Sequence, residues 1–295
     1  MLKVKIMENL KYKNIEVGIS TLGAELKSLK KNGKEYIWCS DPKFWKRSAP
    51  FLFPVVGSLK DKKTTIKGKE YQLSQHGFLR DQEFEVLERK ENSISFISKA
   101  NEETLSHYPF KYETVITYTY ENEALETKIK IKNIGDSELY FNIGGHPAFN
   151  CPLYEGEKFE DYKIIFEKEE TFNSPLVCEG GLLDFNTGVY NKQNIKEIVL
   201  DKEIFTIDTI LIKDVKSKTI KLVNKDDKGI EFSYPKFSTL AIWTPYNEAP
   251  FICLEPWIGY NDLVDTKGTY EEKADLVYLN KDEEFVCSYF IKVLD

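Results

Sequence analysis

The sequence contains few cysteines, histidines and arginines, and these shortages exclude several classes of protein. Its five cysteines are odd in number, widely spaced and without a C-x-x-C pair. This pattern argues against a disulfide framework or a zinc ribbon, so we interpret the cysteines as reduced, packed side chains. Lys and Arg total 41 against 48 Asp and Glu, and no basic stripe is present. We therefore do not expect nucleic acid as a partner.

Long hydrophobic runs are also missing. The longest apolar stretch, residues 49–56, is interrupted by Pro50 and Pro54 and is far shorter than the roughly 20 residues that cross a bilayer. The first ten residues, MLKVKIMENL, contain no apolar signal-peptide core and no small-residue cleavage site. The sequence therefore predicts no membrane span and a cytoplasmic location.

Several familiar motifs are absent as well. There is no Gly-rich phosphate loop, no dinucleotide fingerprint, no His-Glu-x-x-His and no nucleophile elbow, so we expect no cofactor. Internal repeats, flexible linkers and low-complexity tracts are also lacking. With 41% hydrophobic and 14% aromatic residues, the chain has ample material for a core, and we predict one globular domain over residues 1–295.

The pattern that recurs along the chain is period-two alternation between turn residues, which is typical of half-buried strands. In residues 125–132, Leu125, Thr127, Ile129 and Ile131 share one face and charged residues share the other. This segment and residues 112–120 predict a hairpin, as do residues 63–73 and 219–234, and residues 285–293 predict a last strand. Helical periodicity is weak, with one short turn near residues 101–105, and residues 155–194 include a possible surface excursion. The chain is therefore predicted to be all-β and antiparallel.

Two of the three histidines lie in glycine-containing segments that suit a binding site. His76 precedes Gly77, which allows a sharp backbone turn beside the ring. His146 follows two glycines and precedes Pro147, which favours an extended backbone and displays the imidazole in a fixed direction. A structural turn or core histidine is the alternative for each. His107 has no such surroundings, and we interpret it as a surface or turn residue.

Glu255 interrupts an apolar strand, which makes it an unusual carboxylate. Strand parity places it on the face shared by Phe251, Cys253 and Trp257. An unpaired carboxylate there would be costly, so it should have a partner or bind a proton more readily than usual. A structural ion pair is the alternative, although only three of the 41 basic residues are Arg.

That scarcity makes Arg47 and Arg80 informative, because they flank the segment that contains His76. A guanidinium offers a planar fork for vicinal oxygens or a phosphate, which Lys cannot reproduce. We interpret both arginines as candidate ligand contacts. The alternative is a surface pair with an aspartate such as Asp81 or Asp41.

Four segments, taken in order, resemble the aldose 1-epimerase (galactose mutarotase-like) superfamily. They are RSAPFLFPVVG at 47–57, QHGFLRD at 75–81, GHPAFN at 145–150 and LEPW at 254–257. The resemblance implies a large antiparallel β-sandwich, the supersandwich, that opens and closes hexose rings without metal or cofactor. The HGF-x-R and EPW forms are more similar to the branch that contains hexose-6-phosphate mutarotases.

The resemblance also implies roles for the site residues. His146 is similar in position to the family's general acid and Glu255 to its general base, while His76 and Arg47 look like sugar-binding groups. Asp208 resembles a substrate-binding aspartate. We further expect Arg80 to fix the polar rim and Trp257 to offer an apolar surface to the sugar. Trp243 and Phe78 are assigned to the core, the commoner position of strand aromatics.

The hypothesis is an isomerase that interconverts the α and β anomers of a hexose or hexose 6-phosphate, as a monomer or homodimer. Two alternatives stay open. One is a non-catalytic carbohydrate-binding β-sandwich, because a fold does not define a function. The other is a metal-dependent hydrolase in which His76, His146 and Glu255 bind zinc or iron.

Overall fold

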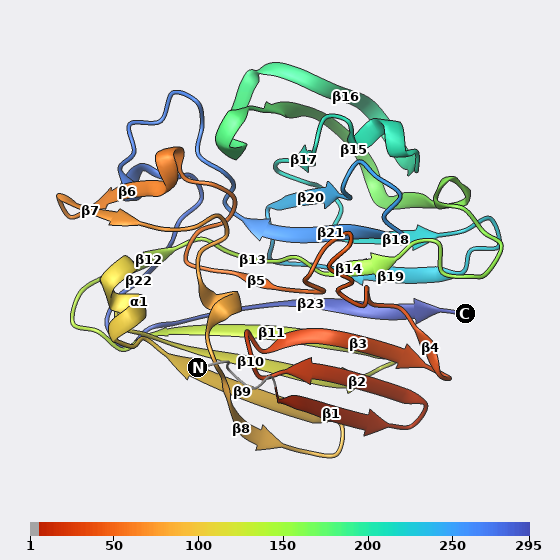
Figure 1. The fold of residues 1–295 in the computed structure, drawn as a ribbon, viewed down its shortest axis with the longest axis horizontal. Coiled ribbons are helices and arrows are strands. Elements are labelled where there is room, and N and C mark those ends of the chain that lie inside the picture. Colours follow the sequence, from red (N-terminus) through yellow and green to blue (C-terminus); the bar gives the residue numbers. More distant parts are fainter. Residues whose placement is uncertain (1–5) are drawn as a thin grey trace.

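The computed structural model describes residues 6–295, and most of them lie in antiparallel strands (Figure 1). Residues 1–5, which belong to the amino-terminal segment that predicts the cytoplasmic location, are outside this range. The one α-helix of the described chain, α1 (Glu102–His107), confirms the expected short helical turn, and it begins at the capping residue Asn101. Short 3-10 turns occur at Lys60–Lys62, Leu79–Asp81, Phe159–Asp161, Glu179–Gly181, Lys202–Phe205 and Tyr270–Glu272. Within residues 6–295, no helix has the length and hydrophobicity needed to cross a bilayer.

A nine-stranded sheet forms one layer. Its order is β16 (Leu183–Val199), β15 (Lys163–Val177), β18 (Thr219–Val223), β19 (Gly229–Ser233), β23 (Glu284–Leu294), β11 (Ala124–Asn133), β10 (Tyr112–Glu121), β9 (Ser93–Lys99) and β8 (Glu85–Arg89). Two of the hairpins predicted from alternation, β10–β11 and β18–β19, lie in this sheet and are confirmed, as are the predicted hairpin in residues 63–73 and the predicted last strand, β23. In β11 the predicted apolar face is buried and the charged residues between are partly exposed.

The opposing layer combines two sheets. The first is β1 (Met7–Tyr12), β2 (Ile15–Ser20), β3 (Glu25–Lys31) and β4 (Lys34–Glu35). The second has the order β17 (Ile210–Ile212), β20 (Thr239–Trp243), β21 (Phe251–Ile258), β13 (Ile143–Gly145) and β5 (Phe51–Leu52), with β14 (Ala148–Asn150) also paired to β21. In Figure 1 this second sheet crosses the middle of the molecule. Two small two-stranded sheets complete the fold: the long-range pair of β12 (Leu139–Phe141) with β22 (Val277–Leu279), and the hairpin of β6 (Lys63–Ile66) with β7 (Lys69–Gln72).

Side chains from both layers meet in one core. The rings of Phe149 and Phe232 lie 5.7 Å apart across the layers, and the Tyr118 hydroxyl donates to the Ala24 carbonyl at 2.7 Å. Core residues extend along the chain from Leu10 to Val293. Burial of apolar surface stabilises the fold by about 25 cal/mol per Å². The all-β antiparallel sandwich predicted from the sequence is confirmed.

The sheet formed by β17, β20 and β21 packs one face against the core and turns the other face outward. The cross-strand row Ile210, Ile242 and Leu254 faces the core, and the next row, Leu211, Ala241 and Glu255, faces the opposite side. Because side chains alternate along a strand, a shift of one residue would exchange the two rows. The apolar pattern of the core row therefore fixes the position of Glu255 on the outer face.

The predicted surface excursion in residues 155–194 is a long paired hairpin rather than an irregular loop. Strands β15 and β16 pair with several register shifts, and in Figure 1 they run across the top of the molecule. Their turn returns to the second sheet, where Leu183 N–H donates to the Asp262 carbonyl at 2.9 Å and Asn261 Nδ2 donates to the Gly181 carbonyl at 2.6 Å. The hairpin tip thus covers the outer face that carries Glu255.

Candidate active site

A cavity of about 300 Å³ lies on this outer face, beneath the tip of the β15–β16 hairpin. Its volume is at the lower end of the range for small-molecule sites. Six of the seven predicted site residues line it: His76, Arg80, His146, Asp208, Glu255 and Trp257. Segments that are distant in sequence therefore converge on one site. Arg47 is the exception, because it is not among the lining residues.

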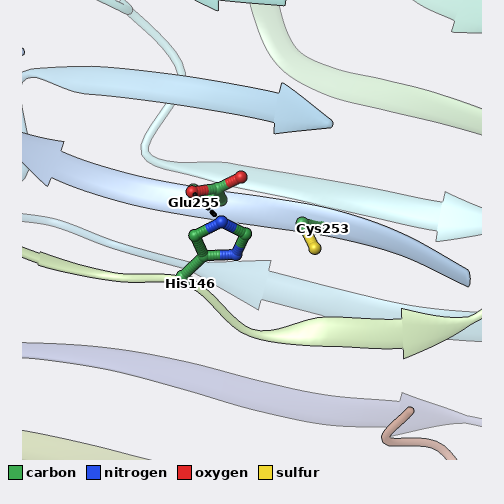
Figure 2. Close-up of side chains that lie close together, drawn as sticks. All are labelled: His146, Cys253 and Glu255. Atoms are coloured by element: carbon green, nitrogen blue, oxygen red, sulfur yellow. Dashed lines mark ion pairs between the residues drawn. The ribbon is translucent and has the colours of Figure 1, made fainter. Parts of the chain in front are cut away.

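His146 and Glu255 form a close pair on the cavity floor. The distance from His146 Nε2 to Glu255 Oε2 is 3.1 Å, and both side chains are buried (Figure 2). Glu255 comes from β21, and His146 comes from the connection between β13 and β14. Neither Glu255 Oε2 nor His146 Nδ1 has a hydrogen-bond partner, so the two side chains are in close contact without a hydrogen bond between them. Both atoms therefore retain hydrogen-bonding capacity for a ligand.

Burial controls the protonation of this pair. Loss of solvent raises the pKa of Glu255 well above its ordinary value, and the nearby Asp208 raises it further. Burial also lowers the pKa of His146 to about 3, with a further contribution from Arg80. Without a ligand, the pair therefore favours a neutral carboxylic acid beside a neutral imidazole. Transfer of that one proton to His146 gives the imidazolium and carboxylate, and each arrangement contains one proton donor and one acceptor.

The position of the His146 imidazole is set by a backbone segment that runs close to Pro50 and to the core. The His146 N–H donates to the Pro50 carbonyl at 3.1 Å, beside strand β5. A Cβ on Gly145 would lie 2.7 Å from the ring of Tyr289, so only glycine lets the chain pass this close to the core. The imidazole stacks on Trp45, with ring centroids 4.8 Å apart, and meets Trp243 edge-on. These contacts hold the ring against Glu255.

His76 adopts a left-handed backbone conformation, with φ of 64°, which is uncommon outside glycine. Its N–H donates to the Gly57 carbonyl at 2.8 Å, and the Gly57 N–H donates to Nδ1 at 3.0 Å. Burial lowers the pKa of His76, and His146 lowers it further, so the ring is neutral with its proton on Nε2. His76 is thereby prepared to donate a hydrogen bond.

Gly77 explains the sharp turn that accompanies His76. Its φ is 67°, and a Cβ there would lie 2.1 Å from the Phe53 carbonyl oxygen. The turn brings the 75–81 segment against β5, where the Phe78 N–H donates to that same carbonyl at 3.0 Å. The predicted role of the glycine is therefore accounted for by close packing.

The two arginines differ in their surroundings. Arg80 Nη2 donates to the Gln75 carbonyl at 2.6 Å, whereas its Nε is buried without a hydrogen-bond partner. Arg47 Nη2 pairs with Asp81 at 2.8 Å, and its Nη1 donates to the Arg80 carbonyl at 3.4 Å. Burial, together with the charge of Arg47, lowers the pKa of Arg80 to about 10, which leaves it charged at neutral pH. Arg47 supports the Arg80 segment, and Arg80 itself reaches the cavity.

Sequence reasoning missed several lining residues. They are Trp45, Gln75, Val177, Gly181, Leu183, Thr209, Leu211 and Asn261. Trp243 packs against a buried cluster as expected but also lines the cavity, whereas Phe78 is half-buried against the main core. One sequence signal could have identified two of these residues. Side chains on the same face of β17, β20 and β21 as Glu255 should reach the same cavity, and Leu211 and Trp243 lie on that face. His107 is exposed at the end of α1, as predicted.

One group of metal-binding residue types occurs within residues 6–295. His146, Cys253 and Glu255 place one ligand atom each within 4.8 Å of one another. His76 is not part of this group, and its Nδ1 already accepts the Gly57 N–H. The histidine–histidine–carboxylate set considered for a metal hydrolase is therefore not the set that the fold assembles.

The fold and cavity define a galactose mutarotase-like β-sandwich, and comparisons with known proteins agree. The sequence profile of the aldose 1-epimerase family matches residues 9–278. The LacX proteins of Lactococcus lactis, plasmid and chromosomal, are each 35% identical over 97% of this chain and 99% of their own length.

Solved structures are also similar. A galactose mutarotase related enzyme from Lactobacillus acidophilus is 31% identical, with a TM-score of 0.90 over 98% of both chains. A galactose mutarotase-like protein from Lactobacillus casei is 26% identical, with a TM-score of 0.88 over 98% of this chain and 100% of its own. The chain belongs to the aldose 1-epimerase family and is thus an isomerase of the mutarotase type.

Proposed function

We propose that the protein interconverts the α and β anomers of a hexose or hexose 6-phosphate, with His146 and Glu255 as its acid–base pair. The observation that carries this proposal is the 3.1 Å contact between the two groups on the floor of an open cavity. Ring opening needs one proton removed from the C1 hydroxyl and one delivered to the ring oxygen. These two oxygens are bonded to the same carbon, so an acid and a base that lie side by side can serve both.

The proposed sequence of transfers conserves protons. Glu255 takes the proton of the C1 hydroxyl, and His146 as imidazolium protonates the ring oxygen. The bond between C1 and the ring oxygen breaks, and C1 becomes an aldehyde. Rotation about C1–C2 presents the other face, and the reverse transfers close the ring as the other anomer. Each positioned proton transfer typically contributes 10²–10⁴ in rate, so no metal or cofactor is required.

The remaining lining residues suit the binding of a sugar. His76 would donate from Nε2 to a sugar oxygen, and Arg80 and Asp208 would bind hydroxyl groups at the rim. Trp257 would pack against the CH face of the ring. Arg80 is the one Lys or Arg among the described lining residues, and its fork can hold either vicinal hydroxyls or a phosphate. Arg47, beside it, would be the second cation of a phosphate site.

The test is a substrate panel. Freshly dissolved α-glucose and α-galactose and their 6-phosphates are followed by polarimetry or NMR exchange, with and without protein. Wild-type protein should accelerate the approach to anomeric equilibrium for at least one of them. If Glu255→Gln and His146→Asn work as fast as wild type, the assigned roles are wrong.

The panel also separates the open alternatives. A non-catalytic carbohydrate-binding protein would bind a sugar without accelerating anomer exchange. A preference for 6-phosphates that is lost in Arg80→Ala and in Arg47→Ala would identify a phosphate site. The cytoplasmic location and a monomeric or homodimeric state stay predictions.

A further inference from the structure

Cys253 lies beside the His146–Glu255 pair but has no place in the proposed reaction. It precedes Glu255 by two residues on β21, so both side chains leave the same face of the strand (Figure 2). The thiol is fully buried and is not among the groups that line the cavity. Cys253, His146 and Glu255 therefore bring a sulfur, a nitrogen and an oxygen ligand close together beneath the cavity floor.

These three donors match the preferences of one metal ion. Zinc binds thiolate, imidazole and carboxylate, and its sites with three protein ligands keep a fourth position open. The ligand atoms of a tetrahedral zinc site lie roughly 3.5 Å apart. Here one imidazole nitrogen of His146, the sulfur of Cys253 and one carboxylate oxygen of Glu255 lie within 4.8 Å of one another. The widest separation needs to close by about 1 Å, which a small side-chain rotation provides.

The charges of the group also suit a divalent ion. On binding, the Cys253 thiol and the Glu255 carboxylic acid each release one proton to solvent, and the resulting thiolate and carboxylate together neutralise Zn²⁺, while a neutral His146 adds no charge. A neutral cluster avoids the large desolvation cost of an unpaired buried ion. Aromatic residues surround the sulfur, because Cys253 packs in a cluster with Trp38, Phe251 and the partly buried Trp45. Such a shell limits water to the side that faces the cavity.

We propose that His146, Cys253 and Glu255 form a zinc-binding site in which Zn²⁺ inhibits the enzyme by occupying its acid–base pair. The bound ion holds the carboxylate and the imidazole nitrogen, so neither can exchange a proton with a sugar. Its open position faces the floor of the cavity, where C1 of the substrate would lie, so inhibition is competitive with the sugar. The inhibition rests on the proposed function, but the binding of zinc does not.

The binding experiment uses zinc alone. The purified full-length protein competes for Zn²⁺ with a chromophoric chelator, so that stoichiometry and affinity are obtained without a substrate. Wild type should bind one zinc ion per chain, and Cys253→Ala should bind it at least tenfold more weakly. Cys253→Ser, which keeps the size of the side chain, should do the same and covers the case in which the alanine variant folds poorly. Mg²⁺ should not compete, because it prefers oxygen ligands.

Two further cysteines provide matched controls. Cys151 is equally buried but lies elsewhere, and Cys178 lies at the tip of the β15–β16 hairpin near the cavity. Cys151→Ala and Cys178→Ala should bind zinc like wild type. In the anomer-exchange assay, zinc should slow wild type, and Cys253→Ala should keep its basal rate but need at least tenfold more zinc for the same inhibition.

The outcomes separate the two proposals. If wild type binds no zinc at micromolar concentrations, or if both Cys253 variants bind it like wild type, the zinc site is wrong. If zinc binds through Cys253 but the protein accelerates no anomer exchange, the site stands and the proposed function fails. If zinc binds through Cys253 and exchange continues unchanged with zinc bound, the inhibitory role is wrong.

Discussion

Glu25 and Glu255 are both buried carboxylates in the same layer of the sandwich, but their partners differ. Glu25 accepts hydrogen bonds from the N–H groups of Ser48 and Ala49, at 2.6 and 3.1 Å, and pairs with Lys27 at 3.0 Å. Glu255 faces His146 at 3.1 Å, and no N–H donor is present for its Oε2. Buried polar groups in proteins are nearly always satisfied, so the second arrangement needs an explanation.

The other two buried carboxylates of residues 6–295 resemble Glu25. Glu170 accepts the Ser217 N–H at 2.6 Å, and Asp262 pairs with Lys273 at 3.0 Å. Each of these carboxylates connects neighbouring segments and is neutralised or hydrogen-bonded by them. Glu255 instead lies beside the His146 and Trp257 side chains, which line the same cavity. A buried carboxylate that the fold itself does not satisfy is a candidate for catalysis, whereas a satisfied one stabilises the fold.

The largest expected effect follows from replacing each carboxylate by its amide and measuring the rate. Glu255→Gln should lower kcat for anomer exchange by about 10³-fold, within the range for loss of a general acid or base. Glu25→Gln keeps the His146–Glu255 pair and should lower kcat by less than tenfold. Polarimetry under single-substrate saturation measures both. Equal losses in the two variants would contradict the distinction between the two sites.

The same variants should show the opposite order in stability. Glu25→Gln removes the buried negative charge that pairs with Lys27 and weakens two buried hydrogen bonds, so the free energy of unfolding should fall by about 3 kcal/mol. Glu255→Gln removes an acid that has no backbone donor and should change it by less than about 1 kcal/mol. Urea denaturation followed by tryptophan fluorescence measures both, and a larger loss in Glu255→Gln would reverse the interpretation.

Alternation in the sequence was sufficient to predict which face Glu255 occupies. Its parity with Cys253 and Trp257 is local, because side-chain direction in a strand has a period of two. The convergence of His76, His146 and Glu255 came from the family resemblance, and the cavity agrees with it. Local pattern and ordered motifs therefore gave most of the fold and the centre of the site.

The rest of the cavity has no local signal. Trp45 lies in an irregular segment where no periodicity applies, and it reaches His146 through the fold alone. Gly181 and Leu183 lie at the tip of a hairpin whose register shifts several times, so no strand pattern predicts where that tip will lie. The pairing of Arg47 with Asp81 spans 34 positions, and the sequence offered an Arg–Asp81 pair as the alternative to a ligand contact without showing which arginine would form it. Such contacts depend on tertiary packing.

The pH dependence of stability should separate His146 from Glu255, because the two contribute with opposite sign. The pKa of His146 is lowered to about 3 in the folded protein, so below its unfolded value of about 6.5 the unfolded chain takes up the proton first. The contribution of His146 to the free energy of unfolding is therefore complete above about pH 6.5 and is lost as the pH falls. The pKa of Glu255 is raised, so its contribution is present at low pH and is lost as the pH rises.

His146→Asn should therefore reduce, by about 2 kcal/mol, the loss of stability between pH 7 and pH 5. Glu255→Gln should enlarge that loss, since the opposing contribution is gone. His76 is also buried with a lowered pKa and stays in both variants, and burial, the larger cause of that shift, is common to them. Urea denaturation at the two pH values provides the measurement, and a change of the same sign in both variants would contradict the assigned pKa directions.

The smallest expected effects concern the arginines, which repeat the contrast between open and satisfied groups. Arg80 reaches the cavity, and its Nε makes no hydrogen bond although it lies 3.9 Å from Asp81 Oδ2, so Arg80→Ala should raise KM about tenfold or more, as expected for a lost charged hydrogen bond to the sugar. Arg47 is occupied by Asp81 and the Arg80 carbonyl, so Arg47→Ala should raise KM for an unphosphorylated sugar about threefold through the position of Arg80. Asp81→Asn should raise KM by a similar factor, and the double variant should lose less than the sum of the two, because both changes remove the Arg47–Asp81 contact. Additive losses would show instead that Arg47 contacts the sugar directly.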